Sequence, residues 1–254
     1  MWTKRLAGIG VFLLMWEAAP RAGLVPAEYF PPASSAAVAL GGLATSAEFL
    51  EQLAVTWGRT LAGLAIAITL ALAMAIVTGR YQLGRRMLEP LVEMLRVLPP
   101  PALVPLCIFA LGLGARLYLF IIAFAALWPV YLSAANALAA TEPVQLNTGR
   151  AFGYSTWEIL LKLRLPSALP EIFTGVRLAA GIALLAAVAS EMLAAKDGLG
   201  FMLYDSAFTL RVADMFAVMF VVGVSGVLMQ GLVTLARRAA IGWHMRLAAL
   251  REPL

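Results

Sequence analysis

Few residues in this chain of 254 could carry out covalent or metal chemistry. Cys107 is the only cysteine and His244 the only histidine, so the sequence offers no internal disulfide, no metal-binding cluster and no histidine-based proton relay. Cys107 is interpreted as a small apolar side chain in an apolar run, and His244 as an interfacial residue near the tail. No Gly-x-x-x-x-Gly-Lys-Ser/Thr loop is present, so work driven by ATP would need a second polypeptide.

The most informative polar stretch covers residues 142–170, between two long apolar runs. Its pattern predicts a helix over 145–152, a break at Gly153 and a second helix over 157–165 that ends at Pro166. Ser155 and Glu158 have the spacing of a capping box at the start of that second helix. A connection between two membrane spans can be a few residues long, so a loop of two helices favours a surface that docks another protein.

Composition indicates whether the helices on either side of this loop are surrounded by water or by lipid. Hydrophobic residues make up 62% of the chain and charged residues 13%, whereas about 25% charged is usual in soluble domains. The surroundings are therefore predicted to be lipid. The net charge of +5 comes from basic residues in short clusters between apolar runs, which argues against nucleic-acid binding and favours a membrane orientation signal.

An all-α polytopic membrane protein with about six spans is predicted. Residues 60–79 are twenty residues without a charge, and at about 1.5 Å per residue they match the hydrocarbon layer of about 30 Å. The other predicted spans are residues 6–16, 97–115, 117–141, 172–193 and 215–236. Together they form one transmembrane domain over 1–254: a first span and external loop (1–56), core spans (57–236) that include the 142–170 loop, and a tail (237–254).

Several of these spans have irregular features. Pro99, Pro100, Pro101 and Pro105 predict that the third span is short or tilted and that its helix begins after Pro101. Pro129 predicts a kink in the fourth span. Residues 6–16 could be a signal-peptide core but are interpreted as a retained span. Residues 20–56 are predicted to be an external loop with one short amphipathic helix near 48–55.

The fifth span has two further features. Arg177 would cost about 2.5 to 3.5 kcal/mol at the bilayer centre, so it should lie at the interface or face protein. Gly175, Ala179, Ala183 and Ala187 form a small-residue ridge, which we interpret as a helix contact in preference to a solute-lining surface because alanine offers a solute little to bind.

Counting basic residues by loop predicts the orientation. With the N-terminus inside, four basic residues are outside: Arg21, Arg116, Lys196 and Arg211. The inner segments then hold thirteen: Lys4, Arg5, Arg80, Arg85, Arg86, Arg96, Arg150, Lys162, Arg164, Arg237, Arg238, Arg246 and Arg251. The 142–170 loop and both termini are therefore predicted to be cytoplasmic.

A family resemblance follows from the loop. Asn147-Thr148-Gly149, Gly153 and Leu163-Arg164-Leu165-Pro166 stand at the spacing of Glu-Ala-Ala, Gly and Ile-x-Leu-Pro in the permease subunits of binding-protein-dependent ABC importers. The chain resembles the nitrate, sulfonate and taurine branch of that family in further segments: Trp16-Glu17-Ala18, residues 96–106, residues 169–178, and residues 190–195 followed by Gly198-Leu199-Gly200. It departs from the pattern at Asn147-Thr148-Gly149, where the family glutamate is missing and Gly149 weakens the helix by about 1 kcal/mol.

The resemblance implies a non-enzymatic transporter subunit in the bacterial cytoplasmic membrane, with no cofactor of its own. Its expected partners are an ATP-binding subunit in two copies that binds ATP and Mg, a second permease copy, an extracytoplasmic solute-binding protein and the lipid membrane. The 142–170 loop would act as a lever that passes movement of the ATPase to the spans. Its candidate docking residues are Asn147, Gly149, Arg150, Ala151, Phe152, Gly153, Leu163 and Pro166.

Three polar residues are candidates for lining the solute path: Asn136, Ser190 and Glu191. Glu191 is equally well interpreted as an interfacial carboxylate or as part of an external vestibule. So sparse a polar lining leaves the choice of cargo largely to the binding protein, and the chain alone does not specify it.

Two other function classes were weighed. A secondary transporter or channel would be expected to show paired half-repeats with broken helices and ionisable residues at midplane, and neither is visible. A membrane-embedded enzyme would need a catalytic constellation, which one histidine and one cysteine do not supply.

Overall fold

The computed structural model describes residues 2–80 and 82–249, which are helical apart from turns and short connections and contain no β-strand. The predicted fold class, an all-α polytopic membrane protein, is confirmed. Four described helical segments are long and apolar enough to cross a membrane: residues 47–79, 115–139, 156–194 and 212–242. A pair of helices bent by 92°, residues 86–95 and 100–111, could form a fifth, so the predicted number of six is not confirmed.

The described chain forms two compact units. The first contains the residues up to Thr56 together with Glu191–Ser225, and the second contains Trp57–Ser190 together with the chain from Gly226 onward. The boundaries fall within three long helices, α3 (Ala47–Arg80), α9 (Leu165–Ala194) and α11 (Val212–Ala249).

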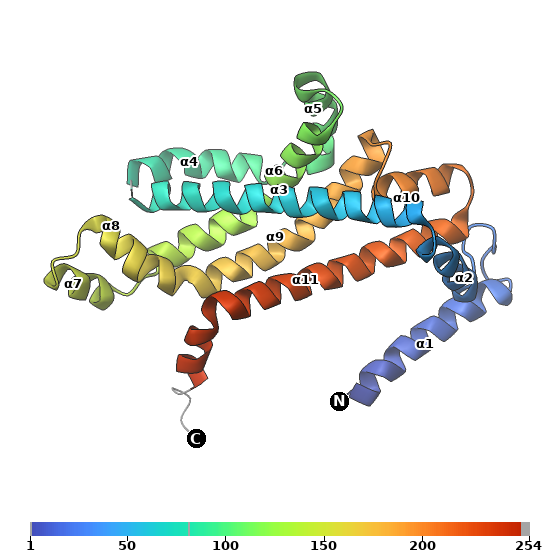
Figure 1. The fold of residues 1–254 in the computed structure, drawn as a ribbon, viewed down its shortest axis with the longest axis horizontal. Helices are drawn as coiled ribbons and strands as arrows, with labels where there is room; N and C mark the ends of the chain where they lie inside the picture. Colours follow the sequence, from blue (N-terminus) through green and yellow to red (C-terminus); the bar gives the residue numbers. More distant parts are fainter. Residues whose placement is uncertain (1, 81, 250–254) are drawn as a thin grey trace. The chain divides into compact units, whose positions relative to one another are not determined.

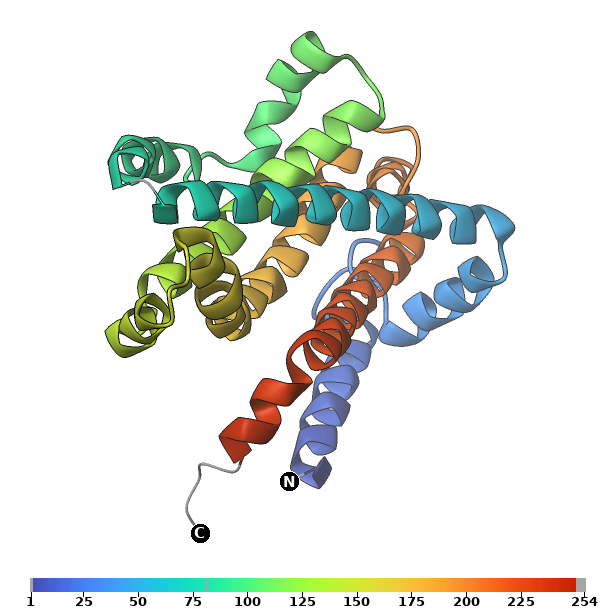
Figure 2. The same ribbon diagram turned by 60° about the vertical axis from the view of Figure 1, so that its left-hand side comes forward.

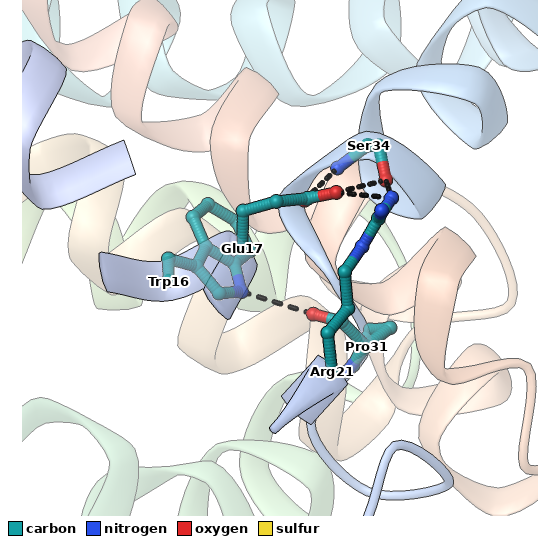
Figure 3. Close-up of polar contacts among 5 residues, drawn as sticks. All are labelled: Trp16, Glu17, Arg21, Pro31 and Ser34. Carbon is teal, nitrogen blue, oxygen red and sulfur yellow. Dashed lines mark hydrogen bonds and ion pairs between the residues drawn. The ribbon is translucent and has the colours of Figure 1, made fainter. Parts of the chain in front are cut away.

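In the first unit, α1 (Trp2–Arg21) and α2 (Ala33–Ala44) are joined by a polar corner (Figure 3). Pro32 precedes α2 and supplies no side-chain cap, so Glu17 takes that role: its carboxylate accepts hydrogen bonds from the Ser34 backbone N–H (2.9 Å) and Oγ (2.8 Å). These two hydrogen bonds, with Arg21 nearby, hold the pKa of Glu17 below its usual range. The pair Trp16-Glu17, which contributes to the family resemblance, is thus a structural corner, since the Trp16 Nε1–H also donates to the Pro31 carbonyl at 3.0 Å.

The rest of the first unit is apolar. Phe30 and Phe216 meet edge to face with ring centroids 5.4 Å apart, and Trp16 packs on both rings. Phe49, Leu199 and Val218 form a buried core that joins the start of α3, helix α10 (Leu199–Phe208) and α11.

The predicted external helix near 48–55 and the predicted second span are one continuous helix, α3. The separation was wrong because no residue between 47 and 80 forces a break: the segment contains no proline, and its many alanine and leucine residues are good helix formers. Helix α2 and helix α10 lie in segments for which the sequence predicted no helix.

In the second unit, the proline-rich third span is short, as predicted. A 3₁₀ turn (η1, Pro100–Leu103) leads into α5 (Val104–Leu111), which ends at Gly112 and packs against the start of α6 (Ala115–Ala139), as Figure 2 shows. At eight residues, or about 12 Å, α5 cannot cross a bilayer alone. It is preceded by α4 (Gln82–Leu95), a helix that the sequence reading missed.

Helix α6 is the most buried apolar helix of the described chain. Gly175 of α9 lies against it so closely that a Cβ would stand 2.7 Å from the Pro129 carbonyl oxygen and from Ser133. Ala179, Ala183 and Ala187 are fully buried on the same ridge, so the predicted helix contact is confirmed. On α3, Gly63 meets Ile122 of α6 in the same way.

Pro166 does not end the helix before it. Helix α8 (Thr156–Ile159), a π-helical turn (η2, Leu160–Arg164) and α9 follow one another without a break, and Pro166 and Pro170 both lie inside α9. The predicted stop was wrong because the residue four positions before Pro166, whose carbonyl the proline ring would meet, is Lys162 within the wide π turn, where the ring and the missing N–H are tolerated. The last helix, α11, bends at Ile241, where the backbone is not helical. The side chain of His244 lies outside the described residues.

Candidate functional site

The polar loop forms a helical hairpin at the start of α9 (Figure 1). Its first arm is α7 (Pro143–Ala151), and its second is α8 with the π turn. Gly153 has φ +76° at the joint, a backbone conformation that side chains disfavour. The Tyr154 N–H donates to the Gly149 carbonyl at 3.0 Å and closes the end of α7. The predicted break at Gly153 is confirmed.

The second arm begins with the predicted capping box. Ser155 Oγ accepts from the Glu158 N–H at 3.3 Å, and the Glu158 carboxylate accepts from the Ser155 N–H at 2.9 Å. Lys162 links the start of the second arm to the turn: its Nζ lies 2.9 Å from the Glu158 carboxylate and 4.8 Å from the centre of the Tyr154 ring. These contacts are local, so the hairpin is a preformed element.

Gly149 is buried where the two arms meet. A Cβ at this position would lie 2.7 Å from Leu163 Cδ1 and 3.3 Å from Ile159 Cγ1. The departure from the family alanine therefore gives the Leu163 side chain room against α7. The glycine weakens α7 by about 1 kcal/mol, and this close packing offsets part of that cost.

The eight predicted docking residues divide into two sets. Gly149, Leu163 and Pro166 are buried or half-buried; Gly149 and Leu163 lie where the two arms meet, and Pro166 lies at the start of α9. The other five are exposed: Asn147, Arg150, Ala151, Phe152 and Gly153. Phe152 is 76% exposed, which is unusual for an aromatic side chain on a polar loop and is typical of a surface that a partner covers.

Three exposed apolar residues of the hairpin were missed by the sequence reading. They are Val144 (72% exposed), Trp157 (58%) and Leu161 (55%). Trp157 and Leu161 are four residues apart, so they share one face of the second arm. Their helical spacing was a usable signal, but burial of that face against the neighbouring spans was an equally reasonable interpretation from sequence.

The hairpin also reaches the end of α3. A groove lined by residues of both arms includes Gly79, next to the last residue of α3. Gly79 in turn lies within van der Waals distance of Leu138 near the end of α6, at 3.9 Å from a Cβ position. Displacement of the hairpin would thus act on α3 and on α9, with which it is continuous.

The three path candidates lie in different surroundings. Asn136 is exposed on α6. Ser190 and Glu191 are fully buried near the end of α9, and Ser190 Oγ donates to the Ala187 carbonyl at 2.9 Å. Glu191 accepts from Thr56 Oγ1 at 2.8 Å and from the Gly200 N–H at 3.0 Å.

Glu191 belongs to a cap for helix α10 within the first unit. Three successive backbone N–H groups at the start of α10 find side-chain acceptors: Gly198 on Gln52, Leu199 on Thr56 at 2.8 Å, and Gly200 on Glu191 at 3.0 Å. A buried carboxylate with such partners anchors α10. Neither interpretation of Glu191 from sequence, interfacial or vestibular, included this cap.

Comparison with known proteins identifies the family. The model of the family described as "binding-protein-dependent transport system inner membrane component" matches residues 63–241, well over half of the chain. The chain belongs to this family. It is a permease component of a binding-protein-dependent ABC importer, a multi-pass protein of the inner membrane that lacks an ATPase site of its own. The family implies a separate ATP-binding subunit and a solute-binding protein as partners, and the resemblance inferred from the loop is confirmed.

Several relatives cover nearly the whole permease. The aliphatic sulfonates transport permease protein SsuC of Bacillus subtilis (strain 168) is 28% identical, over 96% of this chain and 88% of its own length. The taurine transport system permease protein TauC of Escherichia coli (strain K12) is 29% identical, over 95% and 90%. The bicarbonate transport system permease protein CmpB of a Synechocystis strain is 28% identical, over 95% and 92%.

A solved structure shares the fold of the permease. A chain of the MetNI methionine ABC transporter in an inward-facing conformation superposes with a TM-score of 0.65 and 18% identity. The match covers 73% of this chain and 92% of that chain. At this identity the likeness supports the fold alone.

Proposed function

We propose that the permease carries a small oxoanion-bearing solute, such as a sulfonate, taurine or bicarbonate, and is driven through the 142–170 hairpin. The names of three relatives, which cover nearly its whole length, support this solute class. We further propose two identical permease copies with two ATP-binding subunits that hold ATP and Mg, and cytoplasmic N- and C-termini, in keeping with the thirteen inner and four outer basic residues of the sequence.

The observation that carries the docking proposal is the exposed apolar surface of the hairpin. Phe152, Trp157 and Val144 are each more than half exposed on a polar loop of two short helices. Gly149 and Leu163 keep the arms together, and Pro166 lies at the start of α9. The exposed residues Asn147, Arg150, Ala151, Phe152 and Gly153 face the ATP-binding subunit. A rigid hairpin continuous with α9 would transmit the movement of that subunit to the spans.

The test compares two exposed aromatic residues. Phe152→Asp should abolish co-purification of the ATP-binding subunit with the permease, because it places a charge in a contact that excludes water. Tyr29→Asp, on a residue 67% exposed in the connection between α1 and α2, is the matched control and should retain the subunit. Full retention of the ATP-binding subunit by Phe152→Asp would contradict the proposed docking surface.

A further inference from the structure

The exposed face of α9 changes character along its length. Toward the hairpin it presents four polar side chains three or four residues apart: Ser167, Glu171, Thr174 and Arg177. Beyond Arg177 the same face presents Leu178 (60% exposed), Ile182 (37%) and Leu185 (67%). On α11, by contrast, the exposed side chains of the second unit are mainly apolar, with Val227 at 72% and Leu228 at 55%. The part of α9 nearer the hairpin thus exposes a polar face, whereas α11 exposes a mainly apolar one.

Arg177 lies within the predicted fifth span (172–193), five residues from the end that is nearer the hairpin. It follows Glu171 by six positions and precedes Glu191 by fourteen, or about 9 Å and 21 Å along the helix. It is the only basic residue between Arg164 and Lys196. A charge at such a depth is costly against lipid and is by default a sign of function.

Gln230 of α11 fixes the orientation of the guanidinium. Arg177 Nε donates to Gln230 Oε1 at 3.0 Å, and Gln230 Nε2 donates to the Arg177 backbone carbonyl at 3.0 Å. Gly181, one turn along α9, lies beside this amide, and a Cβ there would be in ordinary van der Waals contact with Gln230 Nε2 at 3.5 Å. The Nε side of the guanidinium is therefore occupied by a residue of the same unit.

The two terminal nitrogens of Arg177 are differently placed. Among the residues whose side chains the structure describes, neither of them has a hydrogen-bond acceptor, and no ion pair joins Arg177 to Glu171. A guanidinium held at Nε presents its terminal N–H groups as a planar fork that suits two oxygens of a carboxylate, sulfonate or bicarbonate. An oriented and unpaired arginine on an exposed polar face is the arrangement of an anion subsite.

The polar face leads to a cleft at its inner end. Asn136, Thr141, Gln145, Ser167 and the carboxylates of Glu142 and Glu171 line a cavity of about 430 Å³ next to the hairpin. An anion that leaves Arg177 in this direction meets carboxylates, which repel it. These carboxylates weaken the binding of an anion near the inner end of the face, so binding at Arg177 would be transient.

We propose that Ser167, Glu171, Thr174 and Arg177 line the inner half of the translocation path, and that Arg177, positioned by Gln230, is its subsite for the oxoanion of the solute. The choice of an oxoanion rests on the proposed function. The location of the path rests on the polar face itself.

The test measures access and charge at Thr174, one turn from Arg177 on the same face. In the Cys107→Ala background, Thr174→Cys in membranes that contain the full transporter is treated with the anionic sulfonatoethyl and the cationic trimethylammonioethyl methanethiosulfonate reagents. Both should react, because a water-filled path admits charged reagents. Arg177→Gln should lower the ratio of the anionic to the cationic rate at least about tenfold, and Arg177→Lys should keep it.

Val227→Cys, on the apolar face of α11, is the control and should remain unlabelled by both reagents. Should Arg177→Gln fail to insert, the ionic-strength dependence of the two rates at Thr174→Cys replaces it: added salt should slow the anionic reagent relative to the cationic one. Absence of labelling at Thr174→Cys would mean a lipid-facing or packed surface and would overturn the proposal. So would a rate ratio that neither Arg177→Gln nor salt alters.

This experiment needs no knowledge of the cargo. Loss of the ATP-binding subunit in the Phe152 test bears on the coupling proposal alone, whereas the labelling ratio at Thr174 bears on the path alone. The two proposals can therefore fail separately.

Discussion

Two glycines of this permease adopt the same unusual backbone in opposite surroundings. Gly153 in the hairpin has φ +76°, Gly198 before α10 has φ +95°, and each stands shortly before the start of a helix. Around Gly198 the space is filled: a Cβ would overlap the buried carboxylate of Glu191. Around Gly153 no atom lies within 4 Å of a Cβ position.

The difference distinguishes a turn whose polar and apolar groups are covered within the chain, at Gly198, from a turn whose neighbouring side chains remain exposed, at Gly153. The Gly198 joint satisfies its backbone N–H groups with Gln52, Thr56 and Glu191 of the same unit. The Gly153 joint leaves Phe152 and Trp157 uncovered beside it. We propose that the separate ATP-binding subunit covers that exposed surface.

The largest effect is expected at the filled joint. Gly198→Ala should lower the stability of the permease by about 3 kcal/mol or more, because the methyl group displaces the Glu191 carboxylate from its buried partners and the backbone is strained as well. Thermal unfolding in detergent measures this loss. Gly153→Ala, which carries the backbone strain alone, should lose about 1 kcal/mol, and equal losses for the two variants would remove the contrast.

A smaller effect on stability, with a large one on transport, is expected at the open joint. Gly153→Glu should leave the permease in the membrane, because its side chain enters open space, and should abolish ATP-driven uptake by placing a carboxylate on the docking surface. Uptake into cells or proteoliposomes is the measurement. Gly153→Asn, which tolerates positive φ at lower cost, is the control, and normal uptake by Gly153→Glu would contradict the lever.

The smallest effect is expected at the joint between the hairpin arms. Gly149→Ala restores the alanine of the family pattern and gains about 1 kcal/mol of helix propensity, but the new methyl group must displace the flexible end of Leu163. The two effects oppose each other. Stability should therefore change by less than about 1 kcal/mol, and the amount of ATP-binding subunit retained should change by less than about twofold. A loss of the subunit comparable to that expected for Phe152→Asp would show that Leu163 is held more rigidly than its position suggests.

Much of the fold was predictable because apolar runs and caps are local signals. The span predicted over 117–141 corresponds to α6, and those over 172–193 and 215–236 lie within α9 and α11. The break at Gly153 and the Ser155–Glu158 capping box depend on residues within one turn of each other. The docking residues and the path residues remain predictions that the experiments above address.

Other features depend on contacts between distant segments. Glu191 reads as an isolated carboxylate near the end of a span, and only the fold brings Thr56, 135 positions earlier, to its oxygen. From the sequence, Arg177 is only a charge that is costly to place in a membrane helix. Its hydrogen bond with Gln230, 53 positions later, shows that the guanidinium is oriented and exposed.

The sequence by itself therefore determined the lipid surroundings, the long apolar helices, the hairpin and the family, since hydrophobic content, caps and motif spacing are written along the chain. The tertiary structure decided which polar residues are buried in caps, which remain exposed on a helix face, and that Pro166 is accommodated within a continuous helix. Burial and hydrogen bonding depend on which residues are close in space, so they cannot be deduced from the type of a single residue.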